Sequence, residues 1–467
     1  MRQRRAATAI LAAALVVCGT AGAGAVPGRE DRRSSAVVAL VDTGINPYHE
    51  VFRDRSARAY RHPSTYIPGF PRKARALRLS LDEPDYVAAV RADCRTVWSK
   101  VEPGRLYWFP GTRIAGAISF SQRSNHLLCA TPVLDGEGHG TMVASRAAAA
   151  GYGACPDCLV VSVQVPLAFQ LHQGKEPQES IIDALGWLGR NADWIDAESN
   201  SWAPGFPLWD PSGETGMLAN NPALTRSIEA AASEHLGFWA SGNGVAYKYG
   251  VAGHPTTASP YVTPSVIPVG AHDSGRVVAW HGAPPKLVSD GCDSWAAVHD
   301  HVTESGETVG GGTSAATPFV AGGAARILAE ARTILGDTST GVDDGVVARG
   351  PRVLVADGPL ADGELTLEEW RELVLKTASR RPVAQRSDGP PCEPGLYTAT
   401  PLEWSDVPEG YPEYLTIGYG SVDDAAVALA VDVLGGRADL PDRSSTDRFF
   451  ATEAGLRSAL HEVFSTG

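Results

Sequence analysis

Short apolar runs recur along the chain and predict strands. These runs are continuous rather than alternating, and several are rich in β-branched residues, which is typical of strands buried on both faces of a parallel sheet. The strands predicted in this way are residues 36–41, 159–165, 194–199, 236–241 and 266–271.

Helical spacing separates most of these runs. In residues 180–191, for example, apolar side chains recur at Ile181, Leu185 and Leu188. The other predicted helices are residues 142–150, 222–235, 314–335, 367–378, 422–434 and 454–464. Strands that alternate with helices predict an α/β fold, with a mostly parallel, twisted sheet and helices on both faces.

The pattern breaks down over residues 46–134, where Arg, Pro and Tyr are frequent and periodicity is poor. We interpret this stretch as a surface insertion within a single domain that spans residues 36–436. Residues 26–35 are then a short N-terminal segment and residues 437–467 a C-terminal tail.

The first 25 residues have the pattern of a secretory signal peptide. Three arginines precede an apolar run at residues 6–17, and small residues at 23–25 form a cleavage site. The apolar run is too short for a mature membrane span, and no later stretch is long and apolar enough for one. We expect a secreted protein, with lipid attachment at Cys18 as a minor alternative.

Charge narrows the possible partners. The formal net charge is −13, and removal of residues 1–25 takes away three arginines and no acid, which leaves −16. No long basic run follows the signal peptide. The chain is therefore not expected to bind nucleic acid or an anionic membrane. We also expect a monomer.

Signal cleavage would also leave an even number of cysteines, which in an exported chain favours disulfides. Cys94 and Cys129 both lie in the expected insertion and can staple it. Cys155 and Cys158 form a lone CxxC, for which a local bridge is favoured over a redox or zinc half-site.

A serine hydroxyl stands at the start of the longest predicted helix. Residues 311–318 (GGTSAATP) lead into it, and Pro318 is tolerated only in a first helical turn. Ser314 would then lie where backbone N–H groups are unpaired and carry partial positive charge. These groups can hold an oxyanion, so the position suits a nucleophile; the alternative is a glycine-rich turn with a serine cap.

A serine nucleophile needs a base, and the base needs a group that orients it. His139 lies between glycines at the start of a predicted helix, and Asp42 follows the first buried strand. Ligands of open α/β sheets bind at the carboxyl ends of strands, so we expect Asp42, His139 and Ser314 at one sheet edge. Each also has an ordinary interpretation as a turn residue, loop histidine or cap, but one catalytic hypothesis explains all three.

Asn243 is a candidate donor for the oxyanion hole. It follows a predicted strand and is flanked by Gly242 and Gly244, so its amide can project into a cleft. Taken alone, the Asn-Gly pair is ordinary turn chemistry.

Three motifs together resemble the subtilisin-like serine protease family. Its aspartate motif is similar to residues 41–44 (VDTG), its histidine motif to residues 138–144 (GHGTMVA) and its serine motif to residues 312–318 (GTSAATP), in the family's order. Weaker similarity extends over roughly residues 36–434. The resemblance implies a subtilisin-like fold and a serine endopeptidase that cleaves polypeptides through an acyl-enzyme.

By the same resemblance, Asp42 orients His139, His139 acts as base and then acid, and Ser314 attacks. Asn243 then belongs to the oxyanion hole. The residues implied to bind substrate are Ser201, Trp202, Ala203, Ser241 and Gly242. No cofactor is expected; calcium is frequent in the family, but no residues match a calcium site.

Two alternatives remain open at this point. Asp42-Thr43-Gly44 and Asp273-Ser274-Gly275 resemble the paired turns of aspartic proteases, whose two carboxylates share a proton. That interpretation leaves His139 and Ser314 without a role and needs an all-β, two-lobed fold. The second alternative is a non-catalytic protein that binds peptides on a protease scaffold.

Overall fold

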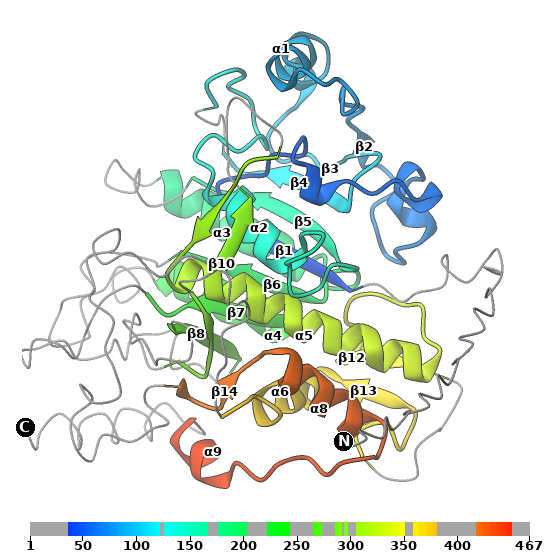
Figure 1. Cartoon of the computed structure of the whole chain (residues 1–467), viewed down its shortest axis with the longest axis vertical. Coiled ribbons are helices and arrows are strands. Elements are labelled where there is room, and N and C mark those ends of the chain that lie inside the picture. Colours follow the sequence, from blue (N-terminus) through cyan, green and yellow to red (C-terminus); the bar gives the residue numbers. More distant parts are fainter. Residues whose placement is uncertain are drawn as a thin grey trace, which may run out of the picture. The chain divides into compact units, whose positions relative to one another are not determined.

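The computed structural model describes most of the chain beyond residue 35 (Figure 1). Contacts divide the chain into two units, Met1–Arg33 and Ser34–Gly467, and every described residue belongs to the second. The described ranges are residues 36–121, 126–166, 176–202, 222–242, 265–272, 285–291, 294–297, 305–350, 358–380 and 417–450. The predicted signal peptide and the predicted helix at 454–464 lie outside them.

Strand β1 (Val37–Asp42) lies inside a sheet that has ten strands among the described residues. The strand order is β14-β9-β8-β7-β6-β1-β5-β4-β3-β2, and all neighbours are parallel except β3 and β4. The other bounds are β2 Arg75–Ala76, β3 Tyr107–Trp108, β4 Ile114–Ser119, β5 Leu159–Gln164, β6 Ala197–Asn200, β7 Leu236–Ala240, β8 Val266–His272, β9 Leu287–Asp290 and β14 Gly420–Ser421. The mostly parallel sheet is thus confirmed.

Helices cover both faces of this sheet, as predicted. Alternate residues of β1 enter two separate apolar cores: Val38 and Leu40 one, Val37, Ala39 and Val41 the other. Helices α2 (His139–Ala148) and α5 (Thr313–Leu335) contribute to the first core, and α3 (Glu176–Gly189) and α4 (Pro222–Glu234) to the second. Burial on both faces explains why β1 is apolar at every position but its last.

Small residues let α5 approach its neighbours closely. A Cβ at Gly322 would lie 2.6 Å from the carbonyl oxygen of Ala147 in α2, and one at Gly323 would lie 2.6 Å from a methyl of Val422. Neither contact tolerates a side chain, so the glycines fix how α5 packs. The helix ends at Gly336, whose φ of 71° is the left-handed conformation that favours glycine.

Residues 46–134 are not purely a surface insertion, which corrects our expectation. Strand β4 pairs in parallel with β5 and is buried at every position. Phe52, Trp98 and Phe109 belong to the same core as α2 and α5. The remaining elements of this segment are η2 Glu50–Phe52, η3 Ala57–Tyr60, η4 Pro63–Thr65, α1 Tyr86–Thr96 and η5 Trp98–Lys100.

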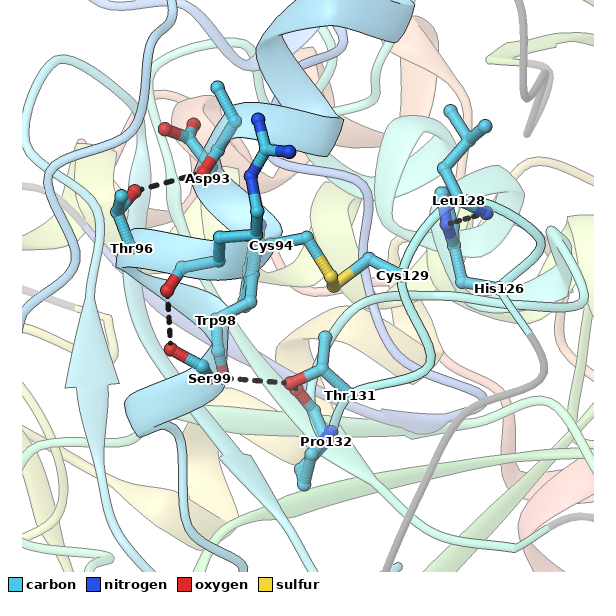
Figure 2. The surroundings of a disulfide bond; sticks show 12 residues. Asp93, Cys94, Thr96, Trp98, Ser99, His126, Leu128, Cys129, Thr131 and Pro132 are labelled. Atoms are coloured by element: carbon cyan, nitrogen blue, oxygen red, sulfur yellow. Dashed lines mark hydrogen bonds between the residues drawn. A yellow bond between two sulfur atoms is a disulfide. The ribbon is translucent and has the colours of Figure 1, made fainter.

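Two disulfides join the cysteine pairs that the sequence suggested. Cys94 of α1 bonds to Cys129, and beside it the Thr131 hydroxyl donates to the carbonyl oxygen of Trp98 at 3.2 Å (Figure 2). Cys155 and Cys158 form the local bridge, in the turn between α2 and β5. Both pairs tie loops to the first core.

The C-terminal elements pack on this domain rather than extending from it. They comprise the hairpin β12 (Val346–Arg349) and β13 (Glu364–Thr366), then helices α6 (Leu367–Lys376), α8 (Asp424–Leu434) and α9 (Ser444–Phe450). A second hairpin pairs β10 (Ser294–Ala297) with β11 (Glu307–Gly310).

The first part of the expected tail therefore belongs to the fold. Phe449 and Phe450 are buried, and the Tyr419 hydroxyl donates to Asp447 at 2.7 Å. Among the described helices, none combines the length and the hydropathy needed to cross a bilayer.

Candidate active site

Asp42 is the last residue of β1, at the carboxyl end of the strand, and its side chain is only 2% exposed. One carboxylate oxygen, Oδ1, accepts from the Thr43 N–H at 2.8 Å and lies 2.8 Å from Nδ1 of His139. Nδ1–H therefore donates to the carboxylate, which leaves Nε2 of the ring as the nitrogen that can accept a proton.

Glycines allow the start of α2 to lie directly against the turn after β1. A Cβ at Gly140 would lie 2.1 Å from the carbonyl oxygen of Gly44, and Gly138 caps the helix at a φ of 88°. His139 is the first residue of α2, three residues earlier than the predicted helix start. Its side chain is 29% exposed, so the ring is buried against Asp42 yet reaches solvent.

A buried carboxylate that the sequence did not reveal as important organises this corner. Asp135 is fully buried, and its two oxygens accept from backbone N–H groups and hydroxyls on both sides of the site. The donors are the Thr43 hydroxyl (2.9 Å), Glu137 N (3.0 Å), Gly138 N (2.9 Å), Thr141 N (2.8 Å) and the Thr141 hydroxyl (2.6 Å). Asp135 thus ties the residue after Asp42 to the first turn of α2. The available signal was an Asp-Gly-Glu-Gly turn just before His139.

Ser314 is the second residue of α5, after the N-cap Gly312. Its hydroxyl donates to the carbonyl oxygen of Ser201 at 3.2 Å, and the Ser201 hydroxyl donates to the carbonyl oxygen of Ser314 at 3.0 Å. This reciprocal pair fixes the first turn of α5 against the residue that follows β6.

The strand register brings the two halves of the site together. β6 pairs in parallel with β1, with Val41 opposite Asn200, so Asp42 and Ser201 follow at the same level. Neighbouring strands lie about 4.8 Å apart. His139, held by Asp42, and Ser314, held by Ser201, are therefore anchored on adjacent strand ends at one sheet edge. Within the described residues no hydrogen bond links Ser314 to His139.

The family model described as "Subtilase family" matches residues 33–378, which is most of the chain. The chain belongs to the subtilase family. It is accordingly a serine-type endopeptidase, and the aspartic protease alternative is wrong. No curated protein matches it.

Solved structures are also similar to this subtilase. One of them is the crystal structure of a cold-adapted subtilisin-like serine proteinase, at 19% identity and a TM-score of 0.41. That similarity covers 77% of this chain and 86% of the other chain.

Acidic residues around His139 favour its protonated form. Burial alone lowers the pKa of the imidazole, but the charge and hydrogen bond of Asp42, with the charges of Asp135 and Glu137, outweigh it and raise the pKa above its ordinary 6.5. Glu137 is itself affected: burial, followed by Asp135 and Asp42, raises the pKa of its carboxyl.

The other predicted residues of the subtilase site divide into described and undescribed ones. Asn243, Ala203 and Asp273 lie outside the described residues. The buried Ser241 and Gly242, which has a φ of 98°, follow β7. β7 is parallel to β6, so the two strands end at the same edge of the sheet. Trp202 is 5% exposed, and its ring packs on that of Trp239 with centroids 5.6 Å apart. The indole is thus buried against Trp239 rather than exposed to solvent.

The start of α5 offers a free donor. The N–H groups of Ala315 and Ala316 bond to the carbonyl oxygen of Gly312, whereas the Ser314 N–H has no partner among the residues described. Unpaired N–H groups of a first helical turn favour negative charge. Within the described part of the chain, no group of three or more His, Cys, Asp or Glu side chains is placed to hold a metal ion.

Proposed function

We propose that this subtilase is a secreted endopeptidase that cleaves polypeptides with Ser314 as nucleophile, His139 as base and Asp42 as its orienting acid. The observation that carries the proposal is the placement of the Asp42–His139 pair and the Ser314–Ser201 pair on the adjacent ends of β1 and β6. Secretion rests on the signal pattern of residues 1–25.

The chemistry follows from the hydrogen bonds. In the proposed reaction Ser314 Oγ turns from the carbonyl oxygen of Ser201 to His139, and attacks the peptide carbonyl as Nε2 removes its proton. Asp42 accepts from Nδ1–H throughout and stabilises the imidazolium that forms. His139 then donates the proton to the leaving amine, and water releases the acyl group by the same route.

Negative charge develops on the carbonyl oxygen during attack. The Ser314 N–H, unpaired at the positive end of α5, is one proposed donor to this oxygen, and the side chain of Asn243 is the other. Removing such a side-chain donor typically costs about 3 kcal/mol in the barrier. The proposed chemistry uses protein groups alone and assigns no cofactor.

The substrate is proposed to lie extended beside the strand ends, where backbone groups can pair with it. The candidate positions are Ser201, Trp202, Ala203, Ser241 and Gly242. Because the Trp202 ring is buried, we assign its contribution to the main chain.

Ser314→Ala tests the proposal. We expect kcat for an unstructured polypeptide to fall by at least about 10³-fold, because the nucleophile is lost while binding remains. The matched control is Ser233→Ala, since the Ser233 hydroxyl is exposed and bonds only within α4. Peptide cleavage by purified protein that survives Ser314→Ala unchanged would show that the nucleophile is misassigned.

A further inference from the structure

Charge is unevenly distributed along this acidic chain. Residues 46–134 contain 14 Lys and Arg against 7 Asp and Glu, whereas the rest of the chain contains 26 against 46. A basic segment on an acidic protein creates a local field that attracts partners of the opposite sign.

The basic residues of this segment concentrate around β2. Between residues 62 and 81 there is no acid, and four cations occur there, which we call the cationic edge: Arg72, Lys73, Arg75 and Arg78. All four are exposed. Within the described residues none of their side chains makes a hydrogen bond or an ion pair, so their charges are available to a partner.

One backbone N–H of β2 is available as well. β2 is the last strand of the sheet, and no other described strand lies on its outer side. The N–H groups of Arg75 and Leu77 bond to Leu106 and Trp108, on the β3 side. Because N–H directions alternate along a strand, the N–H of Ala76 points to the open side.

A hollow of about 370 Å³ lies at the end of β2. Arg53, Arg55 and Arg78 line it together with the half-exposed ring of Tyr60. Its lining also includes three acids, Glu50, Asp82 and Glu83. The hollow can therefore receive side chains of a bound segment. The cationic edge beside it contains no acid, so it favours a segment with negative charge.

The hollow is distant from the candidate active site. Residues 46–51 run alongside α2, with Asn46 N bonded to the Thr141 hydroxyl near its start and Ala150 N bonded to the carbonyl oxygen of Val51 beyond its end. Nine residues of helix span about 14 Å. A ligand here would occupy a second site rather than the catalytic one.

We propose that the cationic edge binds an extended, acidic polypeptide segment, which adds a strand to β2 through the outward N–H of Ala76 and pairs its carboxylates with the four cations. We choose an acidic segment because its negative charge complements the four cations of the cationic edge. The competing explanation is that exposed cations merely protect an open sheet edge from aggregation.

Binding can be measured without cleavage. The full chain carrying Ser314→Ala is titrated into a short labelled peptide that alternates Glu and Val, and fluorescence anisotropy is followed at low and high salt. We expect saturable binding that weakens with salt, and no binding of a Lys and Val counterpart. No binding of the acidic peptide overturns the proposal. Because no hydrolysis is read, failure of the proposed catalytic function would leave this result unaffected.

Charge reversal locates the site. Lys73→Glu/Arg75→Glu is expected to raise the Kd about tenfold. Arg91→Glu/Arg95→Glu is the matched control, since both are exposed cations in α1 and outside the strand. Equal weakening by the two double variants would contradict a site at β2.

Ala76→Pro tests strand addition itself. Proline removes only the outward N–H, because β3 uses the N–H groups of Arg75 and Leu77. We expect binding to be lost while circular dichroism and the Tm stay those of the parent. Undiminished binding by a folded Ala76→Pro variant would overturn the strand-addition proposal.

Discussion

Two buried carboxylates occupy opposite ends of the same pair of strands, and they differ in the group that faces them. Asp196 precedes β6 at the amino end, where its oxygens accept from Val37 N (2.7 Å), Gly341 N (2.7 Å) and the guanidinium of Arg332 (2.6 Å). Asp42 ends β1 at the carboxyl end and faces His139.

Arg332 and His139, which face Asp196 and Asp42, differ in charge and in exposure to solvent. Both members of the Asp196–Arg332 pair are fully buried, and a guanidinium is a fixed cation in proteins. The His139 imidazole is partly exposed, and the acidic residues around it raise its pKa above the ordinary value. A permanently charged, dry pair can stabilise the fold but cannot exchange a proton with a substrate. The imidazole pair can, so we assign structure to the amino end and chemistry to the carboxyl end.

The largest expected effect comes from Asp42→Asn. The amide cannot hold Nδ1–H in the same way, so the imidazole loses its orientation and the stabilisation of its charged form. We expect kcat to fall about 10⁴-fold with little change in Tm. Steady-state kinetics on a short peptide would measure it, and a drop below tenfold would contradict the role of Asp42.

Arg332→Met should instead lower the stability of the fold and leave kcat unchanged. It leaves Asp196 buried without its cation, and breaking such a pair costs about 3–5 kcal/mol of unfolding free energy. The kcat of the molecules that remain folded should not change, which active-site titration would establish.

The matched control lies on the same helix. Arg326 pairs with Asp424 at 2.8 Å on the surface of the protein, so Arg326→Met should cost under about 1 kcal/mol. If urea unfolding showed equal losses for the two variants, burial would not be what distinguishes the amino-end pair.

The smallest expected effect is a shift in pH dependence. The carboxylate of Glu137 helps to raise the His139 pKa, so Glu137→Gln should lower the pKa of the imidazole. The profile of kcat/KM, which reports the free enzyme, should then move toward acid. Glu83→Gln, an exposed acid on the segment 46–134, should leave the profile in place. A shift toward alkali would contradict the electrostatic account.

As pH rises through the His139 pKa, stability and activity should change in opposite directions. The fold raises the His139 pKa, so its contribution to stability is complete below 6.5 and is lost as pH rises through the raised value. Neutral His139, the form that acts as base, accumulates over the same interval. We therefore expect kcat/KM to rise with pH above 6.5 as this small part of the stability is lost.

Much of the sheet can be predicted because its central strands are buried on both faces. Such burial makes β1 and β5 apolar almost throughout, and the helices between strands keep their periodicity. The positions of Asp42, His139 and Ser314 follow from strand ends and helix starts, which sequence patterns mark well.

Other features depend on contacts that a sequence pattern does not express. β4 reads IAGAIS, a weak apolar pattern, yet its residues enter the apolar cores on both faces of the sheet, Ile114 and Ala117 one, Ala115 and Ile118 the other. Asp135 resembles any turn aspartate until the donors from Thr43 and Thr141 are placed around it. The buried Phe449 and Phe450 lie in a segment that is otherwise polar, so the sequence predicted a tail.

The most direct test of the proposed serine chemistry is the site at which a phosphonofluoridate reacts. We predict a single covalent adduct, mapped by mass spectrometry to Ser314, whose rate of formation rises with pH above 6.5 and collapses in His139→Asn. An adduct on another residue, or full peptidase activity in protein modified at Ser314, would contradict the assignment.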